Sequence, residues 1–148
     1  MTSSPSRRPA PPSGQPPPRS VALADGTRLD LEALAGEVCA RYAAEFPDEE
    51  ERYGEAGRHW CVHDNQYLIE WAVLEQAGYV DLEEQVAWLA RVLEARAFPL
   101  DRLARDLDIA ADVLRARAPI AEDAARGLDA AAAMVRARRT FLKRDQGG

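Results

Sequence analysis

From residue 31 to residue 142, apolar side chains recur at steps of three and four, the spacing that places them on one face of an α-helix. The first run shows the pattern with Leu31, Leu34, Val38, Tyr42 and Phe46. No stretch alternates apolar and polar residues at period two, as a half-buried strand does. The sequence therefore predicts an all-α protein and no sheet.

Prolines and capping residues divide this pattern into four or five helices. Pro47, Pro99 and Pro119 mark helix ends or starts, because proline fits the first turn of a helix but not its interior. Asp81, followed three residues later by Glu84, has the spacing of a capping box. We expect long helices at about 30–46, at about 58–76, and from about 81, 99 and 119, with a short one after Pro47. Short links between them predict an antiparallel bundle.

The N-terminal segment has a different composition. Seven of the 10 prolines lie at or before Pro18, and no aromatic residue precedes Tyr42. Such a segment buries too little apolar surface to offset the entropy lost on ordering. The sequence of 148 residues thus predicts a disordered Pro/Arg-rich arm over 1–28, one helical bundle domain over 29–144, and a disordered tail over 145–148.

The sequence lacks the motifs that mark several classes of protein. No apolar run approaches the roughly 20 residues of a membrane span, and Arg7-Arg8 is not followed by the apolar segment of an export signal. We therefore expect a cytoplasmic protein with no membrane partner. Phosphate-binding glycine loops and nucleophile motifs are also absent, so we expect no enzyme activity and no cofactor.

The two cysteines are too few for a disulfide scaffold. Cys39 and Cys61 each fall in an expected buried helix. Cysteine in such places commonly packs as a small apolar residue. We expect both to be core residues.

The two histidines, His59 and His63, stand one helical turn apart. Side chains at this spacing share a helix face and can bind one metal ion. A tight zinc site needs further ligands, which the neighbouring residues do not supply. A metal- or cofactor-binding helical protein that uses these histidines is the alternative hypothesis, with haem ligation as a weaker form of it.

An aromatic stripe runs along the same expected helix, at Trp60, His63, Tyr67 and Trp71. Rings at helical spacing commonly pack in a core. Aromatic rings beside one imidazole can equally line a small-molecule pocket. The sequence leaves both interpretations open.

Both ends of the chain are basic, although the net charge is −6. The C-terminal basic residues are Arg136, Arg138, Arg139, Lys143 and Arg144. They are candidates for a surface that binds an acidic partner. The acidic body argues against nucleic acid, which is usually bound by a basic face. Cations also favour the C-terminal end of a helix for electrostatic reasons alone.

Three consecutive segments carry a resemblance: HWCVHDNQYLIEW at 59–71, EQVAWLARVLEAR at 84–96 and FPLDRLARDLDIAADVL at 98–114. Together they resemble helical sensor or cap modules of bacterial regulators, namely the helical cap before cobalamin-binding domains and the haem-free globin-like sensor domain. The Asp-x-His-x-x-Gly signature of base-off cobalamin binding is absent, since His63 is followed by Asp64. The resemblance implies a module whose chemistry lies in a partner chain.

The leading hypothesis from the sequence is a non-enzymatic, cytoplasmic regulatory or sensor module. It acts through another protein chain, with a homo-oligomer as one form of that association. A small ligand would bind beside the aromatic stripe.

Overall fold

The computed structural model describes residues 16–142, and the prediction of an all-α antiparallel bundle is confirmed. Five α-helices follow a short hairpin. The elements are β1 (Ser20–Ala22), β2 (Arg28–Asp30), α1 (Leu31–Glu45), α2 (Asp48–Gln76), α3 (Leu82–Ala95), α4 (Leu100–Arg117), the 3-10 turn η2 (Pro119–Ala121) and α5 (Glu122–Ala137).

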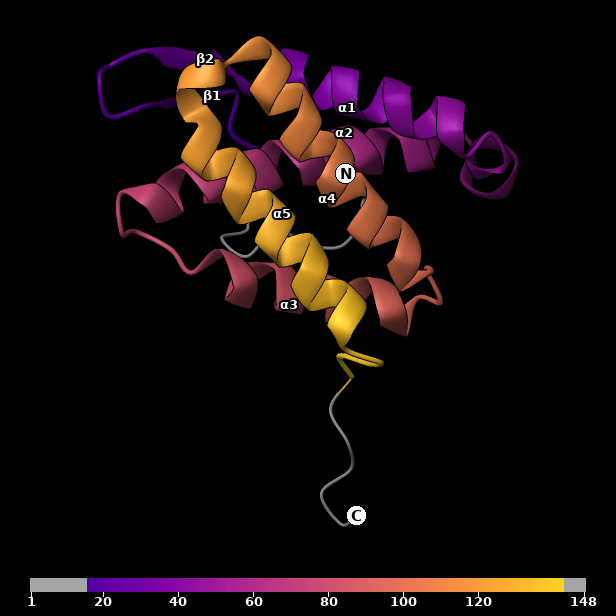
Figure 1. Ribbon diagram of the computed structural model, residues 1–148. Coiled ribbons are helices and arrows are strands. Elements are labelled where there is room, and N and C mark those ends of the chain that lie inside the picture. The colour runs from indigo at the N-terminus through magenta and orange to yellow at the C-terminus, as the bar shows by residue number, and fades with distance from the viewer. Residues whose placement is uncertain (1–15, 143–148) are drawn as a thin grey trace.

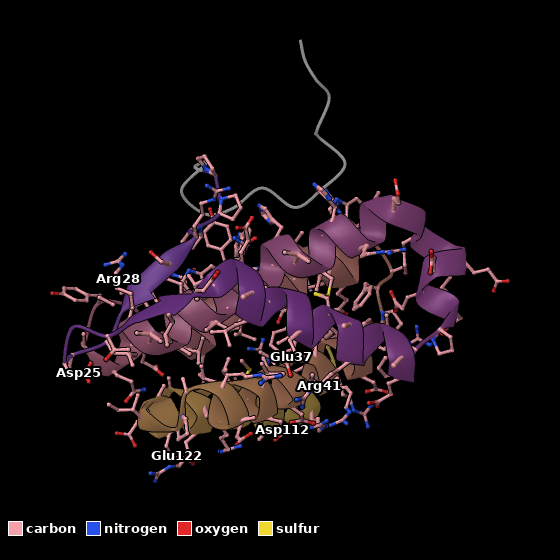
Figure 2. All side chains as sticks on the ribbon, turned by 90° about the horizontal axis from the view of Figure 1, so that it is seen from above. Asp25, Arg28, Glu37, Arg41, Asp112 and Glu122 are labelled. Atoms are coloured by element: carbon pink, nitrogen blue, oxygen red, sulfur yellow. A yellow bond between two sulfur atoms is a disulfide. The ribbon has the colours of Figure 1, made fainter. Side chains whose placement is uncertain are left out.

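The helices form two layers (Figure 1). α1, α2 and α3 run across the view in alternating directions, whereas α4 and α5 form an antiparallel pair that crosses in front of them. Ion pairs add to the contact between the layers. Glu37 of α1, labelled in Figure 2, accepts a hydrogen bond from Arg117 Nε at 2.7 Å.

Capping side chains set two helix starts. Asp30 accepts a hydrogen bond from the Ala33 amide at 3.0 Å, and Asp81 accepts one from the Glu84 amide at 3.1 Å. These bonds satisfy amides that have no partner inside the helix. The predicted starts near residues 30 and 81 are confirmed.

α2 contains a kink that joins the short and the long helix predicted from the sequence. Gly54 has φ 62° and ψ −152° inside the element, a conformation that a residue with a Cβ rarely adopts. The chain before the kink therefore forms a separate short limb, residues 48–53, which turns back toward α4. The long part of α2 is the buried one, as the sequence predicted for a helix that is apolar on most sides.

The hairpin corrects two predictions. Strands β1 and β2 pair antiparallel, with Val21 opposite Leu29 and both side chains buried. The prediction of no sheet was wrong, and a disordered arm cannot extend to residue 28. Residues 1–15 of the predicted arm and the predicted tail at 145–148 lie outside the described residues.

One apolar core connects the two layers. Its fully buried large side chains come from every α-helix: Leu31, Val38, Leu68, Ile69, Leu82, Val86, Leu107, Val113, Leu114 and Leu128. Within residues 16–142, no helix has the length and apolar character needed to cross a membrane.

Candidate functional site

A cavity of about 500 Å³ lies between α1, α2, the C-terminal end of α3 and the start of α4. Most of its wall is apolar. The apolar side chains that line it include Val62, Leu68, Leu89, Leu93, Phe98 and Leu103. Its volume falls in the range of about 300–1,000 Å³ that is usual for small-molecule sites.

A disulfide forms part of the cavity wall. Cys39 of α1 is bonded to Cys61 of α2, with their Cα atoms 6.0 Å apart (the yellow bond in Figure 2). Cys39 is buried, as expected, whereas Cys61 is half-buried, and the bond between them was not predicted. Periodicity showed that each cysteine lies on a buried helix, but not that α1 and α2 bring these two faces together.

Two buried polar side chains, Asn65 of α2 and Asp106 of α4, meet at the cavity wall. Their exposed fractions are 1% and 7%. Asn65 Nδ2 donates hydrogen bonds to Asp106 Oδ1 at 3.0 Å and to the Cys61 carbonyl at 3.0 Å. The same nitrogen lies 3.7 Å from Cys39 Sγ and 3.6 Å from Cys61 Sγ.

The oxygen of the Asn65 amide has no partner. Oδ1 is buried and accepts no hydrogen bond from any described residue. The amide orientation is well defined, because both of its short contacts, Cys61 O and Asp106 Oδ1, are acceptors that require the NH₂ group. A buried acceptor without a donor costs about 1–3 kcal/mol.

Burial raises the pKa of Asp106 to about 7, and the nearby carboxylates of Asp64 and Glu49 add to this effect. The hydrogen bond from Asn65 acts in the opposite direction, because it stabilises the charged form. Near neutral pH this carboxyl can therefore either accept or donate a hydrogen bond.

The rim of the cavity carries charges that are already paired. Arg58 binds Glu50 at 2.7 Å, and Arg102 binds Glu49 at 2.6 Å. The Tyr42 hydroxyl donates to Glu49 at 2.8 Å, and burial, with this bond, raises the pKa of that hydroxyl. These contacts hold the short limb of α2 against α1 and α4.

The structure places only one residue of the aromatic stripe at the cavity. Trp60 lines the cavity, whereas His63, Tyr67 and Trp71 do not. These three are buried and pack ring against ring, with centroid distances of 5.4 Å from His63 to Tyr67 and 5.7 Å from Tyr67 to Trp71. His63 and Tyr67 follow the cavity residues Cys61 and Asn65 by two positions, about 200° around the helix, so they point away from the cavity. Trp60 shares the face of Tyr67 but lies about two turns earlier, at the end of the cavity.

The stripe contacts the segment before β1 instead. Tyr67 Oη donates to the Pro16 carbonyl at 3.2 Å, and the Gln66 amide donates to the Pro18 carbonyl at 2.9 Å. His63 Nδ1 lies 3.2 Å from Asp64 Oδ1. The pocket predicted beside all four aromatic-stripe residues is therefore displaced, with Trp60 alone shared.

The histidines are not joined by a third ligand. His59 is exposed and His63 is buried on the same helix. Among residues 16–142, no group of three or more His, Cys, Asp and Glu side chains has the arrangement of a metal site.

The C-terminal basic residues do not share one helix. α5 ends at Ala137, although the helical spacing of apolar residues in the sequence continues to residue 142. Arg136 pairs with Asp108 at 2.6 Å, and the Arg138 guanidinium lies 4.0 Å from the centre of the Phe141 ring. Arg139 is exposed, while Lys143 and Arg144 lie outside the described residues.

Sequence reasoning missed Asn65 and Asp106, although a signal for each was present. Asp106 stands three residues after Leu103 and four before Ala110, so it falls on the apolar seam of its helix. Asn65 stands between Cys61 and Leu68 at the same spacing. A polar residue on an apolar face is the informative exception.

Comparisons of the chain with protein-family models, with curated proteins and with solved structures found no match.

Proposed function

We propose that this protein is a non-enzymatic helical module that binds a small, largely apolar molecule in the cavity between α1, α2, α3 and α4. The observation that carries the proposal is an apolar cavity of about 500 Å³ with a buried polar pair, Asn65 and Asp106, in its wall. Ligand sites commonly combine an apolar lining with a few polar groups that orient the ligand.

The cavity could instead be a packing defect without a function, and two features argue against this explanation. The pocket opens to solvent, so its apolar lining stays in contact with water, which is unfavourable unless something covers it. A buried carboxyl group and an unpartnered amide oxygen also add no stability to an apolar cavity, because both are costly to desolvate. A ligand with a polar group that matches the carboxyl offsets part of this cost.

The proposal includes a regulatory role through a partner protein, as the resemblance to sensor and cap modules implies. The limb at 48–53 supports it, because this limb forms part of the rim and is joined to the rest of α2 at the Gly54 kink. A bound molecule that shifts the limb would change an exposed surface. The cytoplasmic location stays a prediction. The Cys39–Cys61 disulfide argues against it, because such bonds are rare in reducing compartments.

Titration with N-phenyl-1-naphthylamine, an uncharged apolar dye that fluoresces when shielded from water, tests the binding site. We expect saturable binding at one site. Leu93→Trp, at a half-buried lining position, fills the cavity and should weaken dye binding about tenfold or more.

The matched control is Leu74→Trp, at a half-buried position on α2 that does not line the cavity. It should leave the dye affinity unchanged. Absence of saturable binding to the unaltered chain, or equal loss in both variants, would refute the proposal.

A further inference from the structure

We propose that the ligand of this cavity is a small organic cation, a primary ammonium on an apolar alkyl or aryl body, held by Asp106. This inference rests on the proposed function and names the ligand class of the same site.

The polar end of the cavity presents acceptors and has no spare donor on Asn65. Both hydrogens of Asn65 Nδ2 are used, one by the Cys61 carbonyl and one by Asp106 Oδ1. Asn65 Oδ1 remains without a partner. An ionised Asp106 adds further acceptor sites beside it. A ligand that reaches Asp106 from the cavity must therefore bring an N–H or O–H donor, whereas Asn65 Oδ1 is too enclosed to be contacted from the cavity.

No protein cation neutralises Asp106. Among residues 16–142, its hydrogen bond comes from Asn65, and no arginine forms an ion pair with it. Arg102, one helical turn earlier, instead binds Asp48 and Glu49. A buried carboxylate without a cation is costly, and an ammonium ligand removes that cost.

The cavity wall also favours a cation over an anion. The lining includes three arginines, Arg58, Arg96 and Arg102, and four acids, Glu49, Glu50, Asp64 and Asp106. The Arg96 guanidinium lies 6.0 Å from the centre of the Trp60 ring, so the aromatic faces that can attract an organic cation are those of Tyr53 and Phe98. Asp64 and Glu49 are near enough to disfavour the charged form of Asp106, so they disfavour an added anion as well. The remaining wall is mostly aliphatic and suits the apolar body.

A primary ammonium fits these demands better than an alcohol of the same shape. It brings a full positive charge together with N–H donors, so it can both bond to the ionised Asp106 and neutralise it. Hydrogen bonds between charged partners are roughly twice as strong as those between neutral ones. A hydroxyl group can donate to Asp106 but brings no charge to neutralise it.

Isothermal titration calorimetry with three probes of nearly equal shape tests the ligand class. The probes are 4-phenylbutylammonium, the neutral 4-phenylbutan-1-ol and the anionic 4-phenylbutyrate. At pH 8 we expect the ammonium to bind about tenfold or more tightly than the alcohol, and the carboxylate to bind weakest.

Asp106→Asn is the decisive variant, since it removes the charge and keeps the shape. The ammonium affinity should fall about tenfold, to the level of the alcohol, while the alcohol affinity should change less than about threefold. Asp112→Asn is the matched control, because it removes an exposed carboxylate from the same helix. It should preserve the order of the three probes.

The results separate this inference from the proposed function. Equal binding of the alcohol and the ammonium, or an ammonium preference that survives Asp106→Asn, overturns the ligand class while the binding site stands. Dye binding without binding of any of the three probes also overturns it. Failure of both the dye and the probes refutes the proposed function itself.

Discussion

Asp106 couples the stability of the fold to pH. Its carboxyl titrates at about pH 7 in the folded chain and near 3.8 when unperturbed, because burial disfavours the charge. Between these two values the folded state keeps a proton that the unfolded state has lost. Stability contributed by Asp106 is therefore fully present at low pH and is lost as pH rises from about 4 to 7, at about 1.36 kcal/mol per unit.

Urea unfolding at pH 5 and pH 8 measures this effect. We expect the difference in unfolding free energy between the unaltered chain and Asp106→Asn to change by about 3 kcal/mol over that interval, with the unaltered chain losing stability. The comparison of the two proteins cancels the other carboxyls. Parallel pH profiles would show that Asp106 is charged in both states or neutral in both.

Two tryptophans on α2 should differ in what they contribute. Trp71→Phe, in the core and away from the cavity, should cost about 2 kcal/mol of stability and leave the dye affinity unchanged. Trp60→Phe, on the cavity wall, should change the dye affinity several-fold with less effect on stability. Chemical denaturation and dye titration of both variants check this, and the reverse pattern would contradict the placement of the cavity.

At the scale of elements, the disulfide holds α1 to α2. It closes a loop with a sequence separation of 22, so it restricts the unfolded chain by about 3 kcal/mol. We expect reduction by dithiothreitol to lower the unfolding free energy by about that amount. The Cys39→Ser/Cys61→Ser variant should start at the lower value and show no response to the reductant.

The helices could be predicted from the sequence because their signals are local. Asp30 and Asp81 cap helices within three residues, and Pro47, Pro99 and Pro119 act on their own turns. The hairpin could not be predicted. Each strand has three residues and buries one side chain, Val21 or Leu29, too short a run for alternation to be recognised.

At the scale of the whole molecule, the site depends on which helix faces meet. Periodicity assigns Cys39, Cys61, Asn65 and Asp106 to buried faces, but it does not tell which buried face opposes which. The cavity exists because α1, α2, α3 and α4 leave one volume unfilled among them. For the same reason the aromatic stripe, a pattern on one helix, could not tell a core from a pocket: Trp60 lines the cavity, whereas His63, Tyr67 and Trp71 are buried elsewhere.

The bond between Cys39 and Cys61 makes the cavity sensitive to the redox conditions around the protein. Thiol reductants such as those of a cell interior can open it, whereas oxidising surroundings preserve it. Once the disulfide is reduced, α1 and α2 are no longer covalently joined beside Asn65 and Asp106, and the cavity can change shape. We therefore expect ligand binding to depend on the redox conditions around the protein as well as on ligand concentration.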